Sequence, residues 1–340
     1  MILRNTGLVV FSLMILSLPA ADFPSAEISN GQIRAKLYLP DPKNGFYRST
    51  RFDWSGVIGS LEYKGHEYYG TWFNRIDPKV HDFAYEGSEI VASPFTAMLG
   101  PGEEFQTNGK ALGWDEAKPG GTFIKIGVGV LRKPDESNYD RFKYYEIVDP
   151  GKWSVKKARD SVEFTQELSD PASGYAYLYR KIVRLTRGKP QMIIEHSLKN
   201  TGRREIQTTV YNHNFLALDK QPPGPDFVIT FPFPLQSRRP PDKSVGELKG
   251  NQILYVKTLE NQERMATSLD GLSQNPADFD VRIENKKVGA GMRITGDRPM
   301  SNLGFWSIRA VLSVEPYNAM TIPPAGEFTW KLTYDYYTLP

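Results

Sequence analysis

Hydrophobic and polar residues alternate in short runs along this chain, from about residue 26 to its end. The alternation is clearest at residues 33–39 and 175–185. The final run places five hydrophobic side chains on one face: Phe328, Trp330, Leu332, Tyr334 and Tyr336. A period of two residues is that of a β-strand with one buried face. Gly, Pro, Asn and Asp separate the runs, and no long stretch has helical spacing. The pattern therefore predicts an all-β protein with two stacked antiparallel sheets.

Turn residues and local hydrophobicity allow more detailed predictions for four segments. Residues 123–131 are hydrophobic almost throughout, which predicts one buried strand. Hairpins are expected at Asp149-Pro150-Gly151 and at Asn200-Thr201-Gly202, because a strand-like run stands on each side of both turns. The segment 100–105 has the composition of a turn, and its two acids would face either solvent or a cleft.

Composition narrows the class of protein. The 340 residues include no cysteine, which excludes disulfides, thiolate zinc sites and cysteine nucleophiles. The 42 Lys and Arg residues against 39 Asp and Glu give a formal charge of +3. These charges are scattered, so we expect no nucleic-acid partner. No recognised metal or dinucleotide motif is present, so neither a metal nor a cofactor is predicted. Proline-rich segments at 221–225 and 238–243 join runs of similar character, so residues 22–340 are predicted to form a single domain.

The first 21 residues have the pattern of a secretory signal peptide. A short basic start containing Arg4 precedes the apolar stretch 8–18, and small residues follow at Ala20 and Ala21. The apolar stretch is too short to span a bilayer comfortably, which favours cleavage over anchoring. We therefore expect a periplasmic or secreted protein that has no membrane attachment once the signal is removed.

His213 is the first candidate for acid–base chemistry. In a strand over residues 206–215 it shares a face with Tyr211 and Phe215, and Asn212 lies on the other face. A histidine held between aromatic side chains can act as a general acid or base. Periodicity alone favours the alternative, a half-buried histidine that bonds a neighbouring carbonyl.

Glu315 is the second candidate. It ends the apolar run 310–314 and is followed at once by Pro316, so its carboxylate would be fixed at the rim of a sheet, where sites are often built. Partial burial would raise its pKa toward that of a useful base. The alternative is a surface glutamate at a turn. If His213 and Glu315 meet, they supply the acid and the base that opening and closing a sugar ring require.

Together these segments resemble the galactose mutarotase (aldose 1-epimerase) family. The resemblance rests on Asn212-His213-Asn-Phe-Leu-Ala-Leu218, on Ser313-Val-Glu315-Pro316 followed by Ile322-Pro-Pro-Ala-Gly326-Glu327, and on the preceding Asn200-Thr-Gly202 turn. It implies a large antiparallel β-supersandwich that binds a small carbohydrate across a concave sheet face. It also implies that Glu315 takes the proton of the anomeric hydroxyl while His213 protonates the ring oxygen, so that the sugar anomers interconvert.

The resemblance and the local chemistry suggest further substrate-binding residues. Asn74-Arg75-Ile76 matches an early family triplet and nominates Arg75. The family's sugar-binding aspartate has no clear counterpart in this sequence, and Asp226, which follows the proline-rich segment 221–225, is nominated in its place. Arg51 and Asp53 stand next to Trp54 and could fork onto sugar hydroxyls, or form a structural ion pair over a core tryptophan. The remaining candidates are Glu104, Asn212 and Trp306, of which Trp306 either stacks on a sugar or fills the core.

Three functions remain open. The leading one is a secreted sugar isomerase that uses His213 and Glu315. The family's usual second histidine is absent from residues 109–115, which favours a carbohydrate-binding protein without catalysis. A lyase or glycoside hydrolase on the same fold is the third. A hydrolase would need a second carboxylate, from Glu104 or Asp53, to face Glu315 across the cleft.

Overall fold

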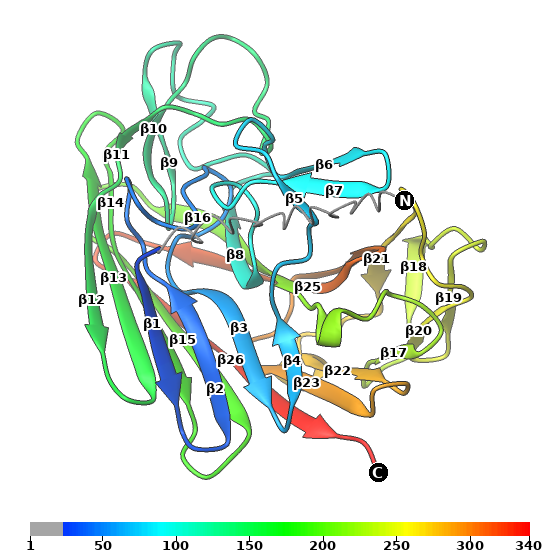
Figure 1. The fold of residues 1–340 in the computed structure, drawn as a ribbon. Helices are drawn as coiled ribbons and strands as arrows, with labels where there is room; N and C mark the ends of the chain where they lie inside the picture. Colours follow the sequence, from blue (N-terminus) through cyan, green and yellow to red (C-terminus); the bar gives the residue numbers. More distant parts are fainter. Residues whose placement is uncertain (1–22) are drawn as a thin grey trace, which may run out of the picture.

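The structure is a computed structural model that describes residues 23–340, so the predicted signal segment, residues 1–21, lies outside the described residues. Two large antiparallel sheets, of ten and six strands, form the body of the protein (Figure 1). The only helices in residues 23–340 are the short 3₁₀ turns η1 (Leu218–Lys220) and η2 (Pro276–Asp278). Neither is long and apolar enough to cross a membrane. The predicted all-β architecture is confirmed.

The ten-stranded sheet contains, in spatial order, β12 (Lys152–Lys157), β13 (Ser161–Asp170), β14 (Tyr175–Leu185), β15 (Gln191–Asn200), β26 (Glu327–Thr338), β23 (Ala290–Gly296), β22 (Asp280–Asn285), β17 (Phe227–Thr230), β20 (Gln252–Tyr255) and β19 (Gly246–Lys249). The six-stranded sheet contains β18 (Gln236–Arg239), β21 (Arg264–Asp270), β24 (Asn302–Ile308), β25 (Val311–Ile322), β16 (Ile206–Phe215) and β8 (Gly100–Gln106).

Three smaller sheets complete the fold. A four-stranded sheet is formed by β1 (Ser25–Ser29), β2 (Ile33–Tyr38), β3 (Val57–Tyr63) and β4 (His66–Tyr69). The first three-stranded sheet is formed by β11 (Ile147–Asp149), β10 (Gly129–Arg132) and β9 (Thr122–Lys125). The second is formed by β5 (Arg75–Ile76), β7 (Glu89–Ala92) and β6 (Phe83–Glu86), and β5 pairs with β7 in parallel.

Alternating side chains bring the sheets together, as the sequence pattern predicts. Along β26, Trp330, Leu332, Tyr334 and Tyr336 are all buried, and the partly buried Phe328 packs against Trp330. Burial of apolar area of this kind stabilises a fold by about 25 cal/mol per Å². The inner face of the ten-stranded sheet is therefore covered by the six-stranded sheet and by the β1–β4 sheet.

The predicted single strand over residues 123–131 is wrong. β9 ends at Lys125, and the chain turns back so that β10 pairs antiparallel with β9. The turn has Gly127 at φ +79°, and a Cβ there would lie 2.7 Å from the Asp53 side chain. Only glycine fits a left-handed turn pressed this closely against a neighbouring segment. Because the residues on both sides of the turn are hydrophobic, the alternation pattern gives no sign that the chain turns here.

Both predicted hairpins are also wrong. β11 pairs with β10, whereas β12 pairs with β13, so the Asp149-Pro150-Gly151 turn joins two different sheets. In the same way β15 lies in the ten-stranded sheet and β16 in the six-stranded sheet. The Asn200 side chain donates to the carbonyls of Arg204 at 2.7 Å and Ile322 at 2.9 Å, which holds this crossing in place. Turn residues reveal a reversal of the chain but not the partner of the strand that follows.

The acidic segment 100–105 is a strand rather than a solvated turn. Every residue of β8 is buried, and β8 pairs with β16 along its whole length. Because successive side chains of a strand point to opposite faces, Glu103 and Glu104 face in opposite directions. Glu103 points into the sandwich, and Glu104 points toward the outer face of the six-stranded sheet.

Glu103 belongs to a buried ionic cluster that ties the two large sheets together. It forms an ion pair with Lys181 of β14, lies 2.9 Å from His196 Nε2 of β15, and accepts a hydrogen bond of 3.0 Å from Asn212 of β16. Burial raises the pKa of Glu103, but Lys181 and His196 outweigh burial and hold it at about 2. Asp53 lies in the same cluster, 3.7 Å from Lys181.

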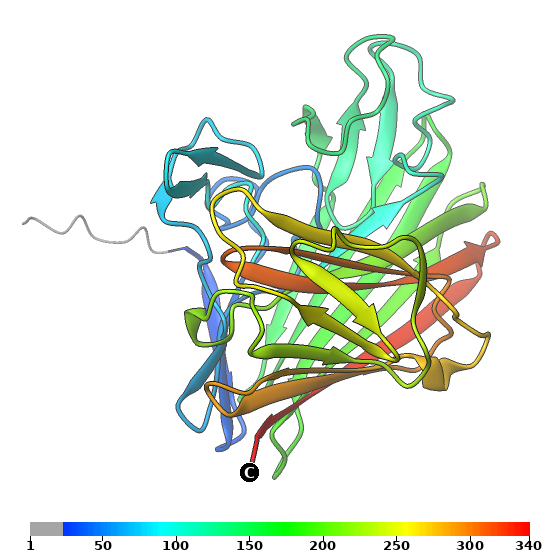
Figure 2. The same ribbon diagram turned by 90° about the vertical axis from the view of Figure 1, so that its right-hand side faces the viewer.

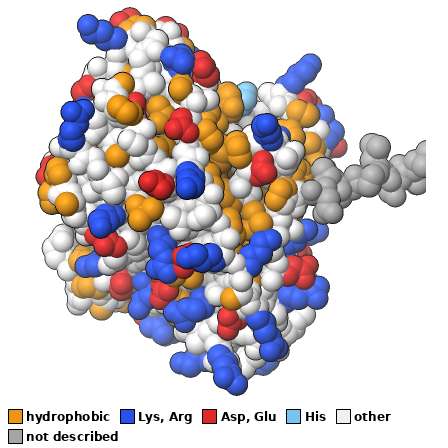
Figure 3. Space-filling model, turned by 90° about the vertical axis from the view of Figure 1, so that its left-hand side faces the viewer, with side chains coloured by type: hydrophobic (Ala, Val, Ile, Leu, Met, Phe, Trp, Pro, Cys, Tyr) orange, Lys and Arg blue, Asp and Glu red, His pale blue; other side chains and the backbone are white. Residues whose placement is uncertain are grey.

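The small sheets β5–β7 and β9–β11 project from the same end of the sandwich (Figure 1; Figure 2). On the molecular face shown in Figure 3, Lys and Arg side chains lie among Asp and Glu side chains. Ion pairs also join neighbouring strands of the ten-stranded sheet: Arg180 of β14 pairs with Glu163 of β13, and Arg184 of β14 pairs with Glu195 of β15.

Replacing Lys181 by Met should lower the free energy of unfolding by roughly 3–5 kcal/mol, because Glu103 would then stay buried without its nearest cation. Urea unfolding followed by tryptophan fluorescence measures this. Lys156→Met is the matched control, since its ammonium group pairs with Glu163 on an exposed surface and contributes little. Equally small effects in both variants would contradict the structural role of the cluster.

Candidate active site

A cavity of about 750 Å³ lies on the outer face of the six-stranded sheet. Its floor is formed by side chains of β16, β24 and β25, among them His213, Trp306 and Glu315. Its walls come from loops and from the small β5–β7 sheet, which contribute Arg51 and Arg141 among others. The volume is within the range of small-molecule sites.

The register of two neighbouring strands brings His213 and Glu315 together. β16 and β25 pair antiparallel with Tyr211 opposite Tyr317, so two residues further along each strand His213 stands beside Glu315. His213 Nε2 lies 3.1 Å from Glu315 Oε1. The structure therefore places the two predicted acid–base residues in direct contact at the floor of the cavity.

Aromatic side chains surround the imidazole of His213. Phe215 stacks on it with ring centroids 3.8 Å apart, and Trp306 presents its edge at 5.2 Å. Phe52 packs on it edge-on at 5.9 Å. Burial among these rings lowers the pKa of His213 well below its ordinary value, because the imidazolium form loses its hydration. His213 is therefore a neutral imidazole at physiological pH.

Glu315 is also largely buried, and this changes its protonation. Gly304 of β24 lies directly beside it, and a Cβ at that position would be 3.0 Å from Glu315 Oε2. Burial raises the pKa of Glu315 to about 7, although the nearby Arg51 opposes the rise. Up to about neutral pH the pair therefore keeps one titratable proton. This proton is on the Glu315 carboxyl, while His213 is a neutral imidazole. Such a pair titrates as a unit rather than as two independent groups.

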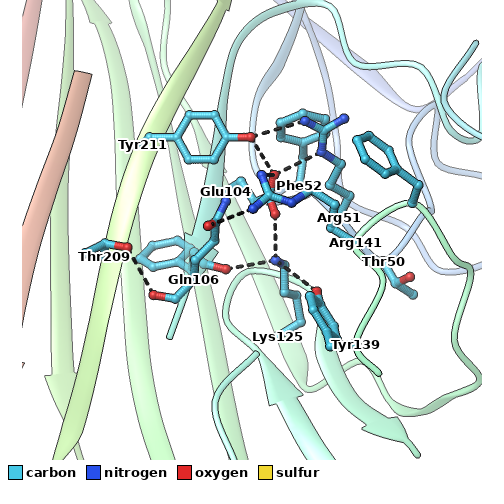
Figure 4. A network of polar contacts seen from close by, with 12 residues as sticks. Thr50, Arg51, Phe52, Glu104, Gln106, Lys125, Tyr139, Arg141, Thr209 and Tyr211 are labelled. Carbon is cyan, nitrogen blue, oxygen red and sulfur yellow. Dashed lines mark hydrogen bonds and ion pairs between the residues drawn. The ribbon is translucent and has the colours of Figure 1, made fainter. Parts of the chain in front are cut away.

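Glu104 lies at the centre of a polar network beside this pair (Figure 4). It is completely buried and accepts hydrogen bonds from Arg51 Nε at 2.9 Å, from the Tyr211 hydroxyl at 2.6 Å and from Lys125 Nζ at 3.2 Å. Burial raises the pKa of Glu104, but the cations outweigh burial and hold it far below its usual range. Glu104 is thus a permanent carboxylate behind the cavity wall, where it positions Arg51 and Tyr211.

Two predicted binding residues, Arg51 and Trp306, line the cavity. The other predicted binding residues do not line it. Asp53 and Asn212 belong to the buried cluster around Glu103, and Glu104 lies behind the wall. Arg75 pairs with Glu86 and Glu89 on the small β5–β7 sheet. Asp226 is exposed in a loop, where its carbonyl accepts a hydrogen bond from Lys286 N at 2.9 Å. Each of these residues has local partners that hold it away from the cavity.

Several cavity residues were not predicted from the sequence. Arg141 and Phe142 come from the loop between β10 and β11, and Asp82 from the turn before β6. Tyr211 shares the strand face of His213, as the alternation predicts, but nothing in the sequence indicates its hydrogen bond to Glu104. Loop residues of this kind carry no periodic signal, and only folding brings their loops next to β16. In residues 23–340 no three histidine or acidic side chains gather closely enough to hold a metal ion.

The sequence matches no family model and no curated protein. Solved structures nevertheless share its fold. A putative aldose 1-epimerase from Escherichia coli K12 is 10% identical, with 93% of this chain and 99% of that chain covered and a TM-score of 0.51. A galactose mutarotase-like protein from Lactobacillus casei is 13% identical, with 92% and 100% covered and a TM-score of 0.51. A GalM/aldose epimerase homologue from C. elegans is 13% identical, with 93% and 99% covered and a TM-score of 0.52.

These likenesses define the class of fold. The chain has the galactose mutarotase-like β-sandwich fold, as its sequence resemblance predicted. Because the identities are this low, the comparison concerns the fold alone, and function has to be argued from the site.

The proton held by Glu315 can be observed directly. With carbon-13-labelled glutamate, one side-chain carboxyl signal of the wild type should titrate at about pH 7. That transition should be absent in Glu315→Gln and present in Glu327→Gln, which removes an exposed carboxylate. If no glutamate titrated near pH 7, the burial argument for Glu315 would be wrong.

Proposed function

We propose that this protein is an aldose 1-epimerase-like isomerase that interconverts the anomers of a small sugar. The observation that carries the proposal is the contact of 3.1 Å between His213 Nε2 and Glu315 Oε1 on the cavity floor. Support also comes from the fold, which is shared with proteins described as aldose 1-epimerases or mutarotase-like. The predicted signal segment leads us to propose that the enzyme acts in the periplasm or outside the cell.

The geometry suits ring opening because the anomeric hydroxyl and the ring oxygen are attached to the same carbon. Two catalytic groups in contact with each other can therefore each reach one of these oxygens within hydrogen-bonding distance. In our mechanism Glu315 accepts the proton of the anomeric hydroxyl, while His213 delivers a proton to the ring oxygen and the carbon–oxygen bond of the ring breaks. Rotation of the open aldehyde and closure on its other face reverse both transfers.

Only the one proton held by the pair is needed for this cycle. The state with Glu315 ionised and His213 protonated has the same proton count as the resting state with a neutral carboxyl and a neutral imidazole. Before ring opening the proton moves from Glu315 to His213 across their 3.1 Å contact, which gives the carboxylate and the imidazolium that the step uses. Ring opening then returns the pair to a neutral carboxyl and a neutral imidazole. The aromatic rings around His213 exclude water, so the proton passes between protein and sugar.

The environment of the other acids disfavours the hydrolase alternative. A glycoside hydrolase needs a second carboxyl group that faces the scissile bond. Glu104 and Asp53, the two residues predicted for that role, are fully buried outside the cavity lining. Asp82 does line the cavity, but it is committed to Arg51 at 2.9 Å.

Loss of either catalytic side chain should abolish the rate acceleration. In NMR exchange spectroscopy with freshly dissolved aldoses, Glu315→Gln and His213→Gln should each slow anomer interconversion by roughly 10²–10⁴-fold, the usual contribution of a well-placed acid or base. Glu327→Gln should retain the wild-type rate. Sugar binding without any acceleration in the wild type would overturn the proposal and identify a carbohydrate-binding protein.

The rate should also fall as the pH rises through about 7. Below this pH the pair retains its proton, and above it Glu315 ionises while His213 stays neutral, so no group remains to protonate the ring oxygen. On the acid side the rate should hold until well below the ordinary pKa of histidine, where a second proton removes the base. The pH profile of kcat for anomer exchange measures both limbs, and a rate that rises between pH 7 and 9 would contradict this assignment.

A further inference from the structure

The cavity wall beside Tyr211 carries more positive than negative charge. Lys125, Arg51 and Arg141 all lie around the single carboxylate of Glu104, at 3.2, 2.9 and 3.7 Å. Asp82 adds one further carboxylate, which pairs with Arg51 at 2.9 Å. Three cations therefore face two carboxylates, and one positive charge is left without a counterion in this network.

Arg51 does not supply that spare charge, because each of its nitrogens has a partner. Its Nε binds Glu104, its Nη1 binds Asp82, and its Nη2 donates to the Tyr211 hydroxyl at 3.2 Å. The guanidinium is also covered by Phe52 and Phe142, at 4.4 and 4.8 Å from the ring centroids. Arg51 is held as part of the wall.

Arg141 is different. Its Nη2 donates to Gln106 at 2.9 Å, but its Nη1 lies 3.7 Å from Glu104, beyond hydrogen-bonding distance. Its Nε has no hydrogen-bond partner among residues 23–340. The side chain is 28% exposed, whereas Glu104 is fully buried, and Arg141 lines the cavity. One edge of its guanidinium is thus available to a ligand.

The remaining groups that line the cavity do not neutralise this charge. Arg264 of β21 lines another part of the wall and forms no ion pair with residues 23–340. Glu315 keeps its proton up to about neutral pH because it is buried. A cavity with this lining attracts an anion, and a guanidinium with a free edge suits a carboxylate or phosphate group.

We propose that the natural substrate is an anionic sugar, which carries a carboxylate or phosphate group that Arg141 binds while the anomeric carbon lies at His213 and Glu315. The inference rests on the proposed isomerase function and narrows its substrate class. It assigns Arg141 as a specificity-determining residue, and Arg264 as a second source of attraction for the anion.

The test compares anionic with neutral sugars as substrates. Anomer exchange is measured by NMR for galacturonate and glucuronate, for galactose 6-phosphate, and for galactose and glucose. We expect kcat/KM to be about 10- to 100-fold higher for one of the anionic classes, the effect of a charge-assisted hydrogen bond, and to decline for that class as salt is added. The uronates and the sugar phosphate distinguish a carboxylate site from a phosphate site.

Variants then assign the preference to Arg141. Arg141→Gln should raise KM for the preferred anionic sugar about 10- to 100-fold and leave KM for galactose within about threefold. Arg141→Lys should restore part of the affinity, because it keeps the charge without the planar fork. Arg264→Gln, at an exposed position, gives a second measurement if Arg141→Gln does not fold. Arg184→Gln, on the ten-stranded sheet, should behave as the wild type.

Calorimetric binding separates this inference from the proposed function. Tight binding of an anionic sugar that depends on Arg141, without anomer exchange, would support the anionic site and overturn the isomerase. Equal turnover of neutral and anionic sugars would overturn the anionic site and support the isomerase. A failure of all these sugars to bind or react would overturn both.

Discussion

Two adjacent buried carboxylates on β8 are the constraint on which the site depends. Glu103 and Glu104 must point to opposite faces of the strand, and neither can remain buried as an anion without cations around it. Glu103 contacts Lys181 and His196 of the ten-stranded sheet. Glu104 contacts Arg51, which comes from a loop, and Lys125, which belongs to the β9–β11 sheet. One strand therefore connects the core to the cavity wall.

The same two carboxylates fix the strand that carries the catalytic candidate. Asn212 of β16 donates to Glu103, and Tyr211 of β16 donates to Glu104, so β16 is held on both faces immediately before His213. A shift of β16 by one residue would break both bonds and turn His213 into the core. The contact between His213 and Glu315 thus relies on charges that never touch a ligand.

Burial also determines the protonation of the site. The aromatic rings and the sheet remove water from both His213 and Glu315, which lowers the pKa of the first and raises that of the second. The two shifts in opposite directions leave a pair that can donate and accept one proton near neutral pH. Arginine side chains line the walls around this floor, so the proposed acid–base pair and the proposed anion site occupy different parts of the cavity.

The sequence by itself determined the all-β class, the strands with period-two burial such as β14 and β26, and the face that Tyr211, His213 and Phe215 share. These follow from local alternation, which any short stretch of chain displays. The family resemblance added the pairing of His213 with Glu315. Tertiary structure alone decided that segment 100–105 is a buried strand, that the turns at residues 149–151 and 200–202 cross between sheets, and that Arg141 rather than Asp53 or Asp226 lines the cavity. Strand partners and loop positions depend on contacts between residues distant in sequence, and a carboxylate such as Glu104 is stable in the interior only after folding has brought cations to it.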